Sequence, residues 1–497
     1  MLKIFNTLNL AISKAEMKGY IRPSFFIWLL SALFLLTATQ VGLSRFSPDS
    51  WSYFELSKTI FSDEFYKFNT YRSYFSQTQS AAFPFGYPIA LALTHEILGT
   101  SPINAVYLNF LLSIVSTIFI IKICKKYDIS NFVTISIVAT FALNPSYMDE
   151  IFSGRAMPLA ILFVLLATYL IVACNSFVKF FIAGIIFGLA ALVRFDFLVS
   201  AFVLLNLLLF FRDKKASYFL LVNGGFLIGI LPWCIYSEIF FNKFWISDNS
   251  WVALSATPAY VLDYPAHAIA TAFTDPLLFV KKVTWSLLRV LVYVIKDSLK
   301  QPLFLLSFVY VLYALRSTNT KIDKSLIIAA TALLMSLFPY VLTGYVDARY
   351  FSLFFLIATF LLIKRWAMII NERKTDPANN HLLSVAFIST VSMLLFGAVF
   401  AIEVFVNNDA DSLQNKKNEI AISRIHRCHK FQPNTTLIFM GASSSILPMY
   451  GAMTGNRTAF PPSNFDQMDD SEKRAYFSYL KPYHIIINAE EDFQCNK

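Results

Sequence analysis

The residues of this chain that could do chemistry lie where long apolar runs end or break. Asp49 follows the first apolar run, and a carboxylate there could act as a general base. Arg194 and Arg349 lie at similar boundaries, and guanidinium groups bind phosphate through paired hydrogen bonds. An ionisable residue at membrane depth usually lines a cavity or a functional site. These three side chains are therefore the first candidates for a site that handles a phosphate.

Each of these side chains also has a structural interpretation. Asp49 or Ser47 could simply cap a helix. Arg194 could reach lipid headgroups or pair with Asp196. Arg349 could form a salt bridge with Asp347. The sequence leaves both kinds of interpretation open.

Other charged residues are weaker candidates for the same site. Asp149 and Glu150 are adjacent acids that could hold an acceptor or a divalent metal, although a solvated loop face would have the same composition. Arg72 and Arg155 could add positive charge for a phosphate.

A basic pattern between residues 281 and 300 has three interpretations. Lys282, Arg289 and Lys296 are spaced seven residues apart, so they would share one face of a helix. That helix could lie at the membrane surface and bind anionic lipid, or it could guide a lipid-linked phosphate toward a site. Alternatively, residues 278–295 are themselves a membrane span.

The composition places all these residues in a membrane protein. Of 497 residues, 57% are hydrophobic and 14% are charged, against about a quarter charged in an ordinary soluble domain. A soluble chain of this length could not cover its surface with so few polar side chains. Disorder, a disulfide-stapled secreted domain and a nucleic-acid binder are excluded. The net charge of +10 is explained by basic residues that flank membrane spans.

Apolar runs long enough to cross a membrane predict an all-α polytopic fold. One run, 179–211, is interrupted at Arg194. If this run is a hairpin of two short spans, the chain has about eleven spans, and the basic clusters between them lie on the cytoplasmic side. The other runs are 24–44, 102–122, 129–147, 156–174, 217–237, 301–316, 325–343, 350–366 and 382–403.

This topology predicts a membrane module that comprises residues 1–404, with two long outward loops at 45–101 and 238–300. The polar segment 405–497 then lies on the same outward side, as a small C-terminal domain outside the cytoplasm.

The C-terminal segment has the pattern of a small α/β unit. Residues 436–440 and 484–488 are short apolar runs typical of buried strands, and residues 443–452 favour a helix between strands. Cys428 and Cys495 also lie in this segment, and they could form a disulfide in an oxidising compartment.

Five short motifs follow one another along the chain. They are an acidic residue in the first outward loop, a proline-containing aromatic stretch, a glycine-led apolar stretch that ends in arginine, an arginine–tyrosine pair and a C-terminal stretch. They occur at Asp49, Phe83–Pro88, Gly188–Arg194, Arg349–Tyr350 and Tyr450–Pro461.

In kind and order these motifs resemble the GT-C superfamily of membrane glycosyltransferases that use polyprenyl-phosphate sugars. This superfamily includes protein mannosyltransferases and lipid A aminoarabinose transferases. The resemblance covers nearly the whole chain. Phe195 stands where the family pattern has a proline, the usual His or Glu ahead of the proline stretch is absent, and the fourth span lacks the acidic residue that many relatives carry near its start.

The resemblance implies an integral-membrane enzyme, either a hexosyl- or a pentosyltransferase. Its donor would be a polyprenyl-phosphate sugar, and its acceptor a lipid-linked glycan, lipopolysaccharide, lipid A or a protein. It would act on the outer face of a bacterial inner membrane, with the C-terminal domain in the periplasm. No cofactor is certain, and a divalent metal stays open.

The family also implies roles for single residues. Asp49 would be the general base, and Arg194, Arg349 and Tyr350 would bind the lipid phosphate. Because phosphate is already a good leaving group, the second carboxyl group that a glycosidase uses as an acid is not needed. Direct displacement by the acceptor would invert the anomeric carbon.

Two other functions stay open. A transporter or flippase for polyprenyl-linked glycans would be similarly apolar, but it should carry charged groups within its spans and broken helices in paired positions. An assembly protein built on an inactive transferase scaffold is the third alternative. A eukaryotic endoplasmic-reticulum location would place the sequons at Asn434 and Asn456 in the lumen.

Overall fold

The computed structural model describes residues 45–62, 83–173, 176–210, 216–245 and 273–298. It also describes the short stretches 70–71, 337–343, 389–395, 436–440, 457–459, 469–471, 473–474 and 484–488, and the single residues 23, 27, 31, 32, 34, 65, 247, 253, 255, 303, 385, 397, 399 and 422.

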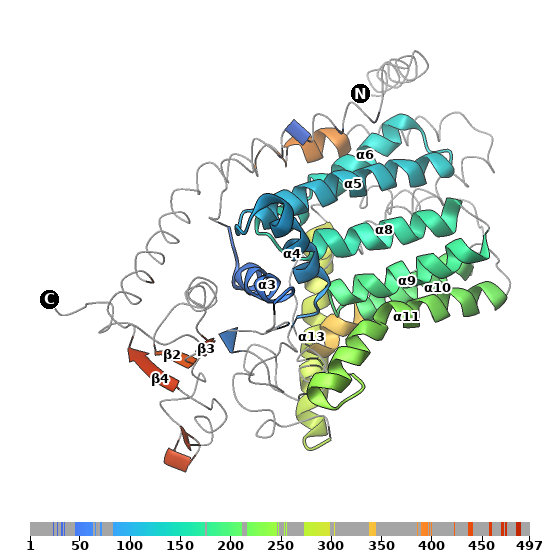
Figure 1. Ribbon diagram of the computed structural model, residues 1–497. Helices are drawn as coiled ribbons and strands as arrows, with labels where there is room; N and C mark the ends of the chain where they lie inside the picture. The colour runs from blue at the N-terminus through green and yellow to red at the C-terminus, as the bar shows by residue number, and fades with distance from the viewer. Residues whose placement is uncertain are drawn as a thin grey trace.

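The described part of the chain is mostly helical (Figure 1). In Figure 1, α5, α8, α9, α10 and α11 lie side by side, and α3 and α4 lie at one end of them. The helices are α3 (Pro48–Thr59), α4 (Gly86–Leu98), α5 (Asn104–Lys126), α6 (Asn131–Ala142), α7 (Pro145–Phe152), α8 (Met157–Ala173), α9 (Phe177–Val193), α10 (Phe197–Phe210), α11 (Ala216–Phe241), α13 (Pro276–Ser298) and α16 (Phe338–Thr343).

Among the described helices, two are long and apolar enough to cross a membrane alone: α5 and the stretch Ser217–Phe241 of α11. The pair α7 and α8 qualifies when taken together, although it is bent by 115° at the break between the two helices. The total of about eleven spans stays a prediction, because runs such as 301–316 and 350–366 lie outside the described residues.

The interrupted run at 179–211 forms two helices, as the hairpin interpretation predicted. α9 ends at Val193, residues 194–196 form a turn, and α10 begins at Phe197. The two helices pack against each other (Figure 1). Arg194 and Asp196 therefore lie in the turn at one end of the hairpin.

Glycines bring α9 and α11 into close contact. A Cβ atom added to Gly188 would lie 2.5 Å from the carbonyl oxygen of Phe226 and 2.7 Å from the Cα of Gly229. Gly184 and Gly225 are equally tightly opposed to the partner helix. In a membrane, small residues four apart let two helix backbones approach in this way. These glycines thereby hold the α9–α10 turn in place relative to α11.

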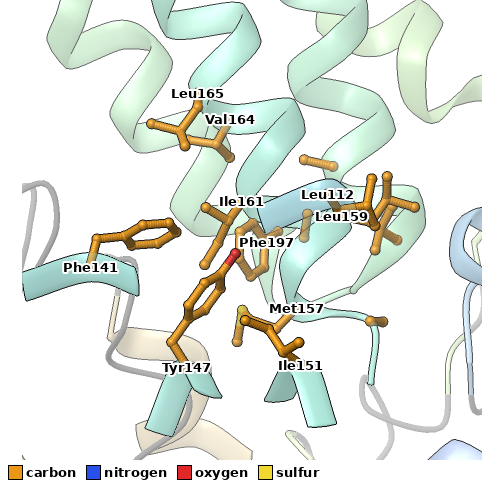
Figure 2. Packing of buried hydrophobic residues seen from close by; sticks show 14 of the residues in the cluster. Leu112, Phe141, Tyr147, Ile151, Met157, Leu159, Ile161, Val164, Leu165 and Phe197 are labelled. Atoms are coloured by element: carbon orange, nitrogen blue, oxygen red, sulfur yellow. The ribbon is translucent and has the colours of Figure 1, made fainter. Parts of the chain in front are cut away.

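A buried core lies beside the turn between α7 and α8. Tyr147 of α7, Phe141 of α6 and Phe197 of α10 belong to one cluster of buried side chains, and Figure 2 shows side chains from these helices converging on α8. The Phe141 and Tyr147 ring centroids are 4.3 Å apart. This core fixes the turn between α7 and α8.

Four short strands form a parallel sheet in the order β1-β3-β2-β4. β2 (Thr436–Met440) and β4 (His484–Asn488) are the two strands that the sequence predicted. β3 (Arg457–Ala459) and β1 (Thr70–Tyr71) complete the sheet, and β1 comes from the segment between α3 and α4. The helix predicted at 443–452 lies outside the described residues, and the division of the chain at residue 404 stays a prediction.

Candidate active site

The first turn of α3 presents Asp49. The Ser47 hydroxyl accepts a hydrogen bond from the Ser50 N–H (3.3 Å), and the Ser50 hydroxyl accepts one from the Ser47 N–H (3.2 Å). This reciprocal arrangement is a capping box, with Pro48 at the start of the helix. The cap of α3 is therefore Ser47, and the interpretation of Asp49 as the cap is wrong. Half-buried Asp49 lies where the helix dipole favours a negative charge.

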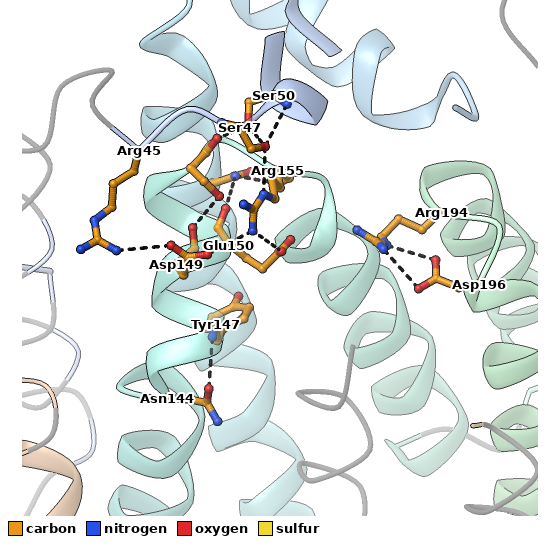
Figure 3. A network of polar contacts seen from close by, with 12 residues as sticks. Arg45, Ser47, Ser50, Asn144, Tyr147, Asp149, Glu150, Arg155, Arg194 and Asp196 are labelled. Carbon is orange, nitrogen blue, oxygen red and sulfur yellow. Dashed lines mark hydrogen bonds and ion pairs between the residues drawn. The ribbon is translucent and has the colours of Figure 1, made fainter. Parts of the chain in front are cut away.

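Arg155 joins the start of α3 to the two adjacent acids of α7 (Figure 3). Its Nη1 lies 3.1 Å from Asp149 Oδ2 and 3.1 Å from Glu150 Oε1. Its Nε donates to the Ser47 hydroxyl at 3.0 Å. A second guanidinium group, that of Arg45, lies 3.4 Å from Asp149 Oδ1. A residue that the sequence ranks low is thus central to this network.

The two acids differ in exposure, and this difference separates their roles. The side chain of Glu150 is fully buried, whereas that of Asp149 is 37% exposed. The interpretation of this pair as a solvated loop face is therefore wrong for Glu150, and Asp149 is the acid that stays accessible to solvent. Within the described residues there is no cluster of three or more histidine, cysteine, aspartate or glutamate side chains that could hold a metal ion.

Side chains of α4 and α5 hold the end of α7 and the turn that follows it in place. The Asn109 amide donates to the carbonyl oxygens of Glu150 (3.3 Å) and Arg155 (2.7 Å). The Tyr87 hydroxyl lies 3.1 Å from both Asn109 Oδ1 and the carbonyl oxygen of Gly154. Gly154 has a φ of +70°, a conformation that favours glycine. The geometry of the acids is therefore fixed by buried polar contacts.

Arg194 forms the ion pair that the structural interpretation predicted. Its Nε lies 3.0 Å from Asp196 Oδ1, and its Nη2 lies 3.3 Å from Oδ2 (Figure 3). The Tyr340 hydroxyl of α16 donates to the same carboxylate at 2.8 Å. Two contacts to Asp196 are compatible with a phosphate ligand, since a guanidinium group has five N–H donors.

Tyr53 is a further residue of this region, and the sequence did not single it out. It lies four residues after Asp49, so both share one face of α3. The side chain is almost completely buried, and its ring packs against Phe83 and Tyr87 with centroids 4.9 and 5.1 Å apart. Its position four residues after Asp49 was the sequence signal that could have indicated Tyr53.

The Tyr53 hydroxyl is affected by charges from several parts of the structure. Burial raises its pKa above the usual value, and the charge of Arg194 acts in the opposite direction. The carboxylates of Asp49, Glu150 and Asp196 add to the increase in pKa. Charges on α3, α7 and the α9–α10 turn therefore all act on this one hydroxyl, which stays protonated.

The remaining predicted site residues fall into two groups. Lys282 of α13 is buried, and its ammonium group donates to the carbonyl oxygen of Ser255 at 2.8 Å, so it points into the protein. Arg289 on the same helix is half-buried. The others lie outside the described residues: Arg72, Arg349, Tyr350, Cys428 and Cys495.

Comparison with known proteins gives matches only among solved structures. No protein-family model and no curated protein sequence matches the chain. ArnT from Cupriavidus metallidurans bound to undecaprenyl phosphate is similar, with a TM-score of 0.55 and 12% identity over 95% of this chain and 90% of that one. The apo state of that ArnT has a TM-score of 0.55 and 13% identity, over 95% and 93% of the two chains. The archaeal oligosaccharyltransferase AglB from Archaeoglobus fulgidus has a TM-score of 0.48 and 10% identity, over 94% and 69%.

The likeness to ArnT extends over almost the full length of both chains, so it concerns the whole architecture. The apolar helices α5 and α11 agree with it, because both have the length and composition of membrane spans. The chain is therefore an integral membrane protein, and its fold is similar to that of ArnT.

Proposed function

We propose that this chain is a membrane glycosyltransferase that moves a sugar from a polyprenyl-phosphate donor to an acceptor hydroxyl on the outward side of the membrane. The proposal is supported by the surroundings of Tyr53, where the charges of Asp49, Glu150 and Arg194 all act on the same hydroxyl. A candidate base and a candidate phosphate ligand thus act on one group. They lie in a fold shared with ArnT, one structure of which holds undecaprenyl phosphate.

The reaction needs one base and one cationic partner. The acceptor oxygen attacks the anomeric carbon, the bond from that carbon to the phosphate oxygen breaks, and the polyprenyl phosphate leaves with the bonding electrons. The carboxylate of Asp49 takes the proton of the acceptor hydroxyl. Arg194 stabilises the charge that grows on the phosphate, and attack opposite the leaving group inverts the anomeric carbon.

The other residues of the site would position the base or complete the binding of acceptor and phosphate. Arg155 holds Asp149 and Glu150 against the capped start of α3, so it fixes the position of Asp49. Asp149, the exposed acid, is placed to meet the acceptor, or a divalent metal if the enzyme uses one. Arg349 and Tyr350 would complete the phosphate site.

The natural setting we propose is a bacterial inner membrane, with the C-terminal segment in the periplasm. The acceptor would be a lipid-linked glycan, lipopolysaccharide, lipid A or a protein, and the donor sugar a hexose or a pentose. These choices follow from the family that the motifs resemble.

The experiment that tests this function compares cell-envelope glycans by mass spectrometry. A deletion strain would be complemented with the wild type, with Asp49→Asn, or with Glu96→Gln as the control. Glu96 is an exposed acid on α4, outside the proposed site. We expect one sugar-sized mass to disappear in the deletion strain, to return with the wild type and the control, and to stay absent with Asp49→Asn. Full restoration by Asp49→Asn would exclude this residue as the base.

A transporter of polyprenyl-linked glycans is the second candidate, and the 115° bend between α7 and α8 favours it. Broken helices are common at transporter sites. However, the ion pairs described above lie at helix ends, on α7 and in the α9–α10 turn, where surface chemistry takes place. Movement of a fluorescent polyprenyl-linked glycan across vesicles that contain the purified protein, without sugar transfer, would favour the transporter.

A further inference from the structure

Helix α13 differs in direction from the helices of the membrane bundle. Figure 1 shows α13 running across the direction of α5, α8 and α9 rather than along it. The helix has 23 residues, which corresponds to about 35 Å. It carries four cations, at Lys281, Lys282, Arg289 and Lys296, and Arg289 would lie near mid-membrane if α13 were a span. Charge at that depth is costly.

One side of α13 packs against the protein. Val290 forms a small buried cluster with Leu337, Tyr340 and Val341 at α16. Lys282 is 4% exposed on this same side. Because Tyr340 also donates to Asp196, this packing places α13 beside the α9–α10 turn and at the level of the candidate site.

The opposite side of α13 is apolar and exposed. Leu277 is 81% exposed, Leu288 is 51% exposed and Ile295 is 64% exposed. Their spacing of eleven and seven residues places them in one row along the helix. A row of large apolar side chains of this length on a membrane protein needs an apolar environment.

The two remaining edges of α13 differ in chemistry. Trp285, Arg289 and Lys296 follow one another at intervals of four and seven residues and form a basic edge, whereas Lys281, seven residues before Leu288, lies on the exposed row. Val280 and Leu287, seven residues apart, lie on the opposite edge, and both are exposed. The helix therefore has a protein side, a lipid side, a basic edge with a tryptophan and an apolar edge.

We propose that α13 lies in the plane of the membrane interface on the side of α3, with its basic edge on the phosphate groups of phospholipids and its apolar edge toward the acyl chains. Interfacial helices have this division between a basic and an apolar flank. Tryptophan favours the headgroup level, and lysine side chains extend to phosphates. This arrangement gives each of the four sides of α13 an environment that matches its residues.

The proposal does not depend on the transfer reaction, so its test needs no substrate. Spin labels on single cysteines at Leu277, Leu288 and Ile295 would be measured in bilayers of phosphatidylcholine and phosphatidylglycerol, by collision with oxygen and with a water-soluble nickel complex. The full-length chain would carry no other cysteine, since all five native ones would be replaced. If α13 lies in the plane, the three labels have the same depth. If α13 spans, the label at residue 288 is about 10 Å deeper than its neighbours, and that result would overturn the proposal.

A span in the same molecule supplies the control. Leu220, Ile228 and Ile239 are exposed positions along α11, and the label at residue 228 should be the deepest of the three. Within α13, a label at Trp285 should be more accessible to nickel than a label at Leu287. Equal or reversed accessibility would show that the basic edge does not face the headgroups.

The contact of the basic edge with lipid phosphate groups is tested separately from the depth of α13 in the bilayer. Changing Arg289 and Lys296 together to glutamate should raise the nickel accessibility of a label at Leu288 when phosphatidylglycerol is present. The variant with Arg289→Lys and Lys296→Arg should leave it unaltered. If the glutamate variant and the charge-conserving variant give the same nickel accessibility, lipid phosphate groups do not hold the basic edge in place.

Discussion

Tyr340 donates a 2.8 Å hydrogen bond from its hydroxyl to Oδ2 of Asp196, the carboxylate that pairs with Arg194. The contact joins segments 144 residues apart in the chain. It links α16, and through α16 the interfacial helix α13, to the turn that carries the candidate phosphate ligand. The hydroxyl also shares the negative charge of Asp196, and this weakens the hold of Asp196 on Arg194.

Replacing Tyr340 by phenylalanine should therefore weaken the binding of polyprenyl phosphate. Without the hydroxyl, Asp196 pairs more strongly with Arg194, and the lipid phosphate must compete with a better partner. We expect the Kd for undecaprenyl phosphate to increase by about tenfold, equivalent to about 1.4 kcal/mol. Binding measured in detergent solution checks this, with Tyr107→Phe, at an exposed position of α5, as the control. An unchanged Kd would separate Tyr340 from the site.

Local patterns in the sequence predict some features of this region and miss others. The break at Arg194 is predictable because charged residues interrupt an apolar run, and 436–440 is predictable as a strand because it is a short apolar run between polar segments. The position of Arg155 is not predictable from the sequence, because its contact with Ser47 joins residues 108 apart and depends on how two turns pack. Spacing likewise shows that Lys282 shares a helix face with Arg289 and Lys296, but only packing decides that Lys282 alone of the three is buried.

The two acids of α7 should respond differently to neutralisation. Glu150→Gln leaves Arg155 without the charge of a fully buried partner, and breaking a buried pair costs about 3–5 kcal/mol. Asp149→Asn removes a partly exposed partner, whose pairing contributes about 1 kcal/mol or less. Thermal unfolding of the two purified variants should show the larger decrease in Tm for Glu150→Gln. The opposite order would mean that Asp149 is the structural member of the pair.

Two neighbouring glycines of α11 provide a matched test of the contact with α9. A Cβ on Gly225 would lie 2.2 Å from the carbonyl oxygen of Phe181, whereas a Cβ on Gly224 meets nothing within 4 Å. Gly225→Ala should therefore separate the helices and destabilise the protein by about 1–3 kcal/mol. Gly224→Ala should leave the Tm unchanged or raise it slightly, because alanine is the better helix former. Equal effects of the two substitutions would contradict the close contact.

His95 should make the stability of the protein depend on pH. Its ring lies 3.1 Å from the Asn104 amide and 3.2 Å from the Ser57 hydroxyl. Burial lowers its pKa, the charge of Lys58 lowers it further, and the Gly99 carbonyl and Glu96 oppose this. A histidine whose pKa is lowered on folding binds fewer protons when folded, so its contribution to stability is full above the ordinary pKa of about 6.5 and is lost as the pH falls through that region.

The Tm of the wild type should accordingly fall more steeply than that of His95→Gln between about pH 7.5 and about pH 5.5. Unfolding scans of both proteins in the same buffers give the comparison. Parallel curves would show that His95 does not titrate on unfolding.

Tyr53 and Tyr87 pack against each other, but substitutions at the two positions should affect different properties. We expect one to lower the transfer rate and the other to lower the Tm. Tyr53→Phe keeps the ring contacts with Phe83 and Tyr87 but removes a hydroxyl that lies among the charges of the site. Transfer should fall by about tenfold or more, since a donor near the reacting groups is lost, with little change in Tm. Tyr87→Phe instead removes the contacts to Asn109 and Gly154, so it should lower the Tm. Transfer rates and melting temperatures measured on both variants decide the matter, and a Tyr53→Phe enzyme with full activity would restrict this residue to a packing role.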